Sequence, residues 1–182
     1  MSELTKIVER CNPDFDAARA ISWRTGEETW AEWLQSLFEP IVLPHLWRVL
    51  NLAERQSARE IIQLDVELNR RLKPWARESS VNAGHLLLQR RTPHSERLMA
   101  RIQEAIQTGE AFGHFATLYA VRCCAFSIPV RTAILGYLVQ ELAVGPPDES
   151  AQVRLLEASV ETVNEFLRIS SNGLNEGLRV HG

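Results

Sequence analysis

The sequence has few cysteines and no long apolar run, and each shortage excludes a class of protein. Its three cysteines are Cys11, Cys123 and Cys124. An odd count with two adjacent members does not make a disulfide framework, because adjacent cysteines pair only with strain. No stretch reaches the roughly 20 apolar residues of a membrane-spanning helix, and no N-terminal run resembles a signal peptide. We therefore expect a reduced, cytoplasmic protein that does not bind a membrane.

Excess charge of one sign is also scarce. The 182 residues carry a formal net charge of -3, which gives no general attraction for nucleic acid or anionic lipid. One basic cluster stands out, consisting of Arg90, Arg91, His94, Arg97 and Arg101. It could bind an acidic partner, although a solvated helix start is the simpler interpretation. Nucleic acid is therefore not an expected partner.

What the sequence does contain is helical periodicity, without any convincing alternation of the kind that strands show. The clearest stripe follows Thr25, which begins a T-x-x-E capping box with Glu28. Its apolar members are Trp30, Trp33, Leu34, Leu37, Phe38 and Ile41. We expect Pro40 and Pro44 to kink or break this helix. A further helix is predicted over 53–71, and others over 75–89 and from Thr92 to Gly109.

The stretch 111–155 is apolar on almost every helical face, which is typical of helices buried by their neighbours. Two helices are predicted to meet at Ser127-Ile128-Pro129, with Ser127 capping the second. Gly145-Pro146-Pro147 should end the second helix, and a last helix is predicted over 149–170. The fold class is therefore all-α. We expect a single-domain bundle of about eight or nine helices around this central apolar hairpin, with variable N-terminal helices over 1–24 and a loose tail over 171–182.

No group of residues carries the signature of a catalytic or metal site. His114 and Cys124 stand ten positions apart, about three helical turns, which is too far for one ion. No pair has the spacing that places two ligands on one helical face, and His85 and His181 are more simply solvated. The sequence therefore predicts no cofactor, no metal and no enzymatic activity. Desolvation should raise the pKa of thiols at Cys123 and Cys124 and leave them inert.

The five tryptophans fall into two groups. Trp30 and Trp33 lie on an apolar face and are predicted core residues. Trp23, Trp47 and Trp75 stand near helix ends, and exposed tryptophan is enriched where proteins dock on proteins.

Three segments together resemble the urease accessory protein F (UreF) family. The first contains Arg77-Glu78, four residues of other types, Ala83-Gly84 and an apolar run. The second is Phe115–Val144, which looks like the family's paired apolar helices. The third is Ala143–Leu156, where Pro146 matches but Ala143 replaces a lysine and Asp148-Glu149 replaces Gly-Gln. The family's N-terminal glycine-rich motif and its C-terminal Ser-Arg-Leu-Phe ending have no counterpart.

The resemblance implies an all-helical, non-enzymatic scaffold that forms homodimers. Its partners would be other urease accessory proteins, including a GTPase that delivers nickel, and apo-urease. The implied partner-binding residues are Arg77, Glu78, Gly84 and Pro146, with Arg77 and Glu78 supporting the helix pair and Pro146 the turn that faces partners. Two alternatives stay open. One is a maturation chaperone for another metalloenzyme, and the other is a helical enzyme with a cofactor pocket near His114 or His85.

Overall fold

The computed structural model describes residues 27–89, 96–143 and 149–179, and the side chains of 30–89, 97–141 and 153–170. All regular secondary structure in these ranges is helical, which confirms the predicted all-α class. The capping box at Thr25, the N-terminal helices and the Gly145-Pro146-Pro147 stop lie outside the described residues.

The first described element is one continuous rod made of α3 (Glu27–Trp33), the π-helix η1 (Leu34–Val42) and α4 (Leu43–Glu54). Of the kink or break predicted at Pro40 and Pro44, the break is wrong, because the helix continues through both prolines. Because these three elements are joined, the described residues contain seven continuous helices, fewer than the predicted eight or nine. The predicted stripe is confirmed, since Trp30, Trp33, Leu34 and Phe38 are buried and Leu37 and Ile41 pack against the core.

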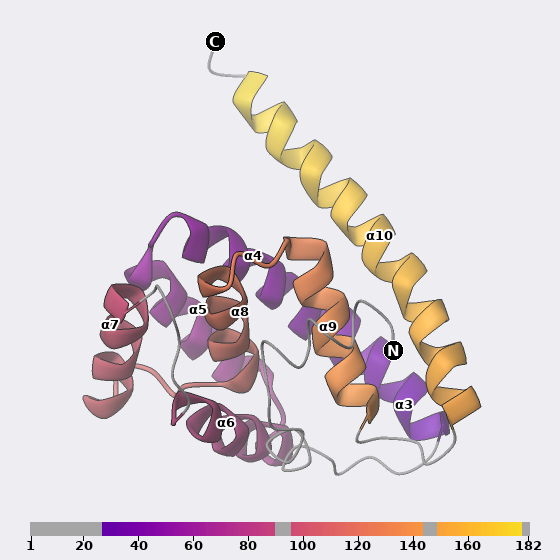
Figure 1. Cartoon of the computed structure of the whole chain (residues 1–182), viewed down its shortest axis with the longest axis horizontal. Coiled ribbons are helices and arrows are strands. Elements are labelled where there is room, and N and C mark those ends of the chain that lie inside the picture. The colour runs from indigo at the N-terminus through magenta and orange to yellow at the C-terminus, as the bar shows by residue number, and fades with distance from the viewer. Residues whose placement is uncertain (1–26, 90–95, 144–148, 180–182) are drawn as a thin grey trace.

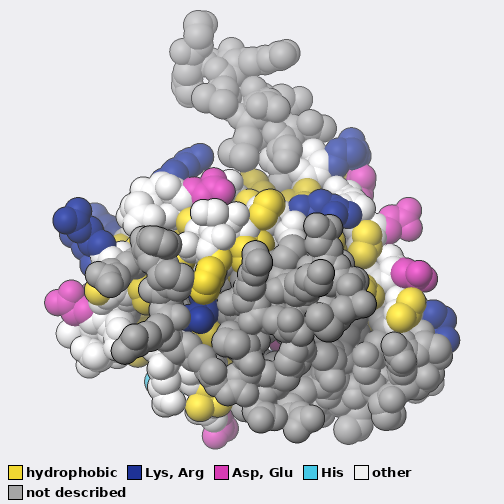
Figure 2. Space-filling model, in the orientation of Figure 1, with side chains coloured by type: hydrophobic (Ala, Val, Ile, Leu, Met, Phe, Trp, Pro, Cys, Tyr) yellow, Lys and Arg dark blue, Asp and Glu magenta, His cyan; other side chains and the backbone are white. Residues whose placement is uncertain are grey.

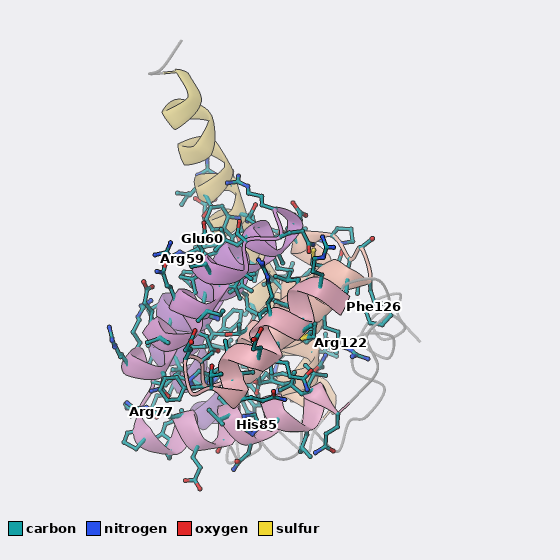
Figure 3. All side chains as sticks on the ribbon, turned by 90° about the vertical axis from the view of Figure 1, so that its left-hand side faces the viewer. Arg59, Glu60, Arg77, His85, Arg122 and Phe126 are labelled. Atoms are coloured by element: carbon teal, nitrogen blue, oxygen red, sulfur yellow. The ribbon has the colours of Figure 1, made fainter. Side chains whose placement is uncertain are left out.

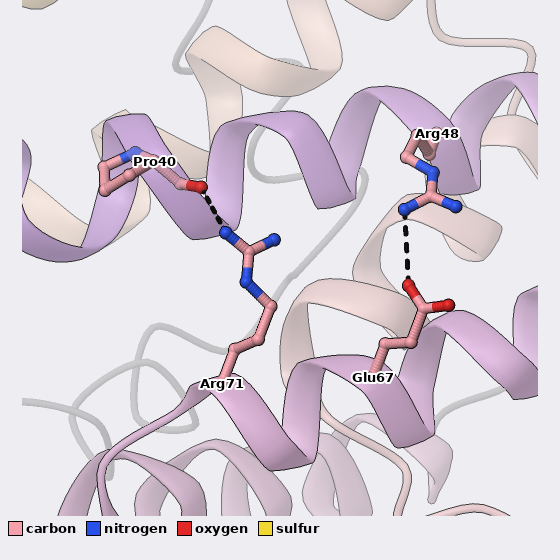
Figure 4. A network of polar contacts seen from close by, with 4 residues as sticks. All are labelled: Pro40, Arg48, Glu67 and Arg71. Atoms are coloured by element: carbon pink, nitrogen blue, oxygen red, sulfur yellow. Dashed lines mark hydrogen bonds and ion pairs between the residues drawn. The ribbon is translucent and has the colours of Figure 1, made fainter.

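The helix continues through its prolines as a π-helix, which has wider turns, and a side chain of the following helix donates a hydrogen bond to one of its carbonyls. The Leu43 N–H donates to the carbonyl of Phe38, five residues back, as in a π-helix. In an α-helix the Pro40 carbonyl would accept from residue 44, but Pro44 has no N–H. Arg71 donates to the same carbonyl, since its Nη2 lies 2.6 Å from the Pro40 carbonyl oxygen (Figure 4).

Left-handed residues end the next helices. α4 stops at Glu54, and Gln56 follows with a φ of 57°, while the Ser57 N–H donates to the Leu52 carbonyl. This is a Schellman cap, and it divides the helix predicted over 53–71, so that α5 begins only at Ala58. α5 (Ala58–Arg71) is followed by α6 (Pro74–Leu88) and α7 (Glu96–Gln107). Gly109, with a φ of 78°, closes α7 as predicted.

α8 (Phe115–Ala125) and α9 (Val130–Ala143) are the two predicted apolar helices. Ser127 does not cap α9. It has a φ of 55° and lies at the end of α8, where the N–H groups of Ser127 and Ile128 donate to the carbonyls of Cys124 and Cys123. The serine thus takes the left-handed position that glycine usually occupies.

α8 is the centre of the molecule, because every side chain from Phe115 to Cys123 is buried. Figure 1 shows it between α4 and α6, and these two helices are its main neighbours. α9 packs mainly against α10 (Glu149–Arg179) and α4. α8 and α9, the two helices of the predicted hairpin, are both buried but contact each other directly only over a short length. α10 continues through the predicted stop at 170–173, because an interior glycine costs only about 1 kcal/mol.

The described surface is mixed in character. On the face seen in Figure 2, side chains of both charge signs are dispersed, with apolar side chains between them. Among the described residues, no helix has the length and apolar content that crossing a membrane would require.

Candidate functional site

The predicted site residues that the structure describes lie along α6, which Figure 3 shows beneath α8. Arg77 is half-buried and its Nη2 donates to the Leu72 carbonyl at 2.9 Å, so it joins the start of α6 to the end of α5. Glu78 is exposed, whereas Gly84 is buried. Pro146 lies outside the described residues. On α6, Glu78 thus faces outward, whereas Arg77 and Gly84 hold the helix in place.

Gly84 is required by a close approach of two backbones. A Cβ atom added at this position would lie 1.9 Å from the carbonyl oxygen of Gly113 and 3.0 Å from the amide nitrogen of Phe115. Any side chain there would push α6 away from the segment that leads into α8. Gly113 has a φ of 76°, which glycine adopts without strain, so the contact uses a glycine on each side.

The same segment is fixed from the other side by a buried carboxylate on α5. Asp65 is 1% exposed and accepts hydrogen bonds from the N–H groups of Phe112, Gly113 and His114 at 2.7, 2.9 and 3.0 Å. These groups precede the first turn of α8, where a helix presents unpaired donors and favours negative charge. Asp65 therefore caps the central helix from 47 to 49 residues away in sequence.

A histidine and a threonine extend this cap into the core. The Thr117 hydroxyl donates to Asp65 Oδ1 at 2.7 Å, and His45 Nε2 lies 2.9 Å from the Thr117 oxygen. Because the hydroxyl has given its only proton to Asp65, the Nε2 of His45 carries the proton and donates to Thr117. Burial lowers the pKa of His45 to about 3, against a smaller opposing effect of Asp65. His45 is therefore a neutral donor at physiological pH.

The other histidines near α6 also form hydrogen bonds with groups of the protein. His114 Nε2 lies 3.2 Å from Asn69 Oδ1, and burial lowers the pKa of His114. His85 Nε2 lies 3.2 Å from the Phe112 carbonyl oxygen. Among the described residues, no group of three or more His, Cys, Asp or Glu side chains could hold a metal ion.

The remaining sequence candidates divide into core and surface. Cys123 is buried, and burial together with the nearby Glu54 raises the pKa of Cys124, as desolvation predicts. Arg122 is buried with its guanidinium 5.3 Å from the ring centre of Phe126 (Figure 3). Trp75, at the first turn of α6, is 42% exposed.

The roles of Asp65, Thr117 and His45 were not predicted from the sequence. A signal was present for Asp65, because it falls within the apolar stripe of α5 between Leu64 and Leu68, where a carboxylate must find internal donors. The donors themselves lie about 50 residues away, so their identity could not be read from local periodicity.

The fold and the site define an all-helical protein in which buried ionisable groups fix helices in place. The UreF family model matches residues 24–143, roughly two thirds of the chain, and includes every residue of the Asp65 cap and the Gly84 contact. The chain therefore belongs to the UreF family, which confirms the resemblance. No curated protein and no solved structure matches it.

Proposed function

We propose that this protein is a non-enzymatic accessory factor that acts through protein–protein contacts in the maturation of the nickel centre of urease. The observation that carries the proposal is the UreF family match over residues 24–143, because this is a family of urease accessory proteins. Its partners would be other accessory proteins, including a GTPase, and apo-urease, with the chain acting as a cytoplasmic homodimer.

The use of the buried polar residues supports a scaffold role. Asp65 gives its oxygens to three backbone N–H groups and to Thr117, and His45 donates to Thr117. These groups stabilise the start of α8, a role in folding that accounts for their burial without any chemistry on a substrate.

We place the partner-facing surface on α6 and at Pro146, which lies outside the described residues. Arg77 and Gly84 hold α6 against α5 and the start of α8, while Glu78 projects from its exposed side. A rim carboxylate of this kind contributes mainly to orientation and association rate.

The test is a pull-down of tagged protein from its native lysate, with mass spectrometry, in the presence and absence of nickel and GTP. We expect urease subunits and accessory proteins to be recovered. Glu78→Lys should reduce their recovery, whereas Arg59→Glu, at an exposed position near the start of α5, should not. Recovery of a different apo-enzyme would replace urease by another client, and a bound small molecule with no protein partner would refute the scaffold role.

A further inference from the structure

We propose that a hollow between the rod α3–η1 and the start of α6 is a docking site for a partner-protein segment with one apolar side chain flanked by carboxylates. The proposal rests on the function above in that it requires a protein partner. It assigns to that partner a hollow whose lining includes Lys73 and Trp75 but not Glu78.

The size of the hollow suits a single side chain. Its volume is about 120 Å³, somewhat smaller than the roughly 150 Å³ of a cavity that accepts benzene. Trp33, 3% exposed, together with the half-buried Leu37 and Ile41, gives it an apolar lining on the rod. Trp75, on α6, lines it as well. A branched aliphatic side chain would therefore be covered by apolar groups on both sides.

Both walls are already fixed in place. Arg71 Nη2 donates to the Pro40 carbonyl at 2.6 Å and so ties the end of α5 to the π-helix (Figure 4). Arg77 Nη2 donates to the Leu72 carbonyl at 2.9 Å and ties the start of α6 to the same end of α5. A site that is ordered before binding loses little conformational entropy when it is occupied.

Charge selects the kind of segment. Arg71 and Lys73 are exposed on the α5–α6 wall, and Glu32 is exposed on the rod. The bond to Pro40 uses one donor of the Arg71 guanidinium, which has five. Carboxylates beside the apolar anchor can therefore pair with Arg71 and Lys73, whereas Glu32 repels a carboxylate on its own side and so orients the segment.

Trp75 gives the site a rigid aromatic edge. Its side chain is 42% exposed, and its backbone lies in the first turn of α6, directly after Pro74. Tryptophan supplies a large contact area with few rotatable bonds, and it is enriched among residues that dominate binding energy. The combination of an exposed tryptophan, an apolar hollow and two adjacent cations is what an acidic segment with an apolar anchor would recognise.

The probe is a fluorescein-labelled peptide with the sequence Asp-Glu-Leu-Asp-Glu, titrated with full-length protein and followed by fluorescence anisotropy. We expect a dissociation constant of about 1 mM or tighter at low salt, weakening as salt is added. Lys73→Glu and Trp75→Ala should each weaken binding about fivefold or more. Lys73→Glu should keep the fold, because a carboxylate is favoured at the helix N-terminus.

The matched control is Arg59→Glu, which reverses an exposed cation near the start of α5, at the opposite end of that helix from Arg71. It should change the affinity by less than about twofold. The proposal fails if the peptide does not bind at millimolar concentration, if Lys-Lys-Leu-Lys-Lys binds equally well, or if Lys73→Glu and Trp75→Ala have no more effect than Arg59→Glu.

This result is separable from that of the pull-down. Peptide binding that depends on Lys73, together with no recovery of urease components, would keep the docking site and refute the urease role. Recovery of those components, together with peptide binding that ignores Lys73 and Trp75, would refute the docking site alone.

Discussion

Replacing Gly84 with alanine sets helix propensity against a steric clash, and the structure decides which effect is larger. In the interior of α6, propensity alone would stabilise the fold by about 1 kcal/mol. The added Cβ would lie 1.9 Å from the Gly113 carbonyl oxygen, whereas close carbon–oxygen contacts lie near 3.3 Å. The clash is with backbone, so neither side can relieve it by a change of rotamer.

The added Cβ and the Gly113 carbonyl oxygen must therefore move apart by more than about 1 Å, which displaces Gly113 or α6. The Gly113 N–H is 2.9 Å from Asp65 Oδ2, so a movement of Gly113 also weakens the cap of α8. Overpacking typically costs about 1–3 kcal/mol, and each hydrogen bond to a charged group contributes about 1.5–3 kcal/mol. After subtracting the propensity gain, we expect Gly84→Ala to lower the free energy of unfolding by about 1.5–5 kcal/mol.

The assay is urea unfolding followed by circular dichroism. The matched control is Asn82→Ala, which is exposed on the same helix and should stabilise slightly through propensity alone. A Gly84→Ala protein as stable as the wild type, or more stable, would mean that α6 does not lie against the segment before α8. The proposed placement of the partner-facing surface would then be wrong as well.

Four other perturbations test the polar contacts and the core. Asp65→Asn should lower the free energy of unfolding by about 3 kcal/mol or more, because the new amide N–H₂ would replace an acceptor of buried N–H groups; urea unfolding measures it. Arg71→Gln should cost only about 1 kcal/mol but speed hydrogen exchange over 36–44, since the exposed Pro40 carbonyl loses its donor. Leu138→Asp buries an unpaired charge at a fully buried position of α9 and should cost about 3 kcal/mol or more; an unchanged melting temperature would remove α9 from the core. His45 has its pKa lowered from 6.5 to about 3 in the fold, so below pH 6.5 the unfolded chain binds a proton that the fold does not. Stability contributed by neutral His45 is present above pH 6.5 and is lost as the pH falls toward 3, by up to about 1.4 kcal/mol per pH unit. His45→Gln should flatten this part of the pH profile of urea unfolding, and an equally steep profile in the variant would contradict the assignment.

The spacing of apolar residues was sufficient to predict which helix faces are buried. The apolar faces of α3–η1, α5 and α8 were identified from spacing alone, because a continuous apolar stripe has no favourable alternative to burial. The fold class followed from the same pattern. The ends of α4 and α8 did not, because Gln56 and Ser127 occupy left-handed positions for which glycine is the usual signal.

The two largest misses share one physical cause, a compensating partner far along the chain. A proline pair normally ends a helix, but Arg71 donates to the Pro40 carbonyl from 31 residues away. A carboxylate on an apolar stripe is normally unfavourable, but Asp65 meets three N–H groups from the segment before α8. Neither compensating contact has a local signature, so neither could be predicted from the spacing of residues along one helix.

Both compensating side chains lie on α5, and this bears on how mutations of the proposed surface should be interpreted. Asp65 fixes the segment against which Gly84 seats α6, and Arg71 fixes the π-helix that forms the opposite wall of the hollow beside Trp75. A substitution at Asp65 or Gly84 would therefore weaken partner binding by displacing α6, without removing a contact to the partner. Substitutions at Glu78 and Lys73 act on exposed side chains, so a loss of binding at unchanged thermal stability is the result that separates recognition from support.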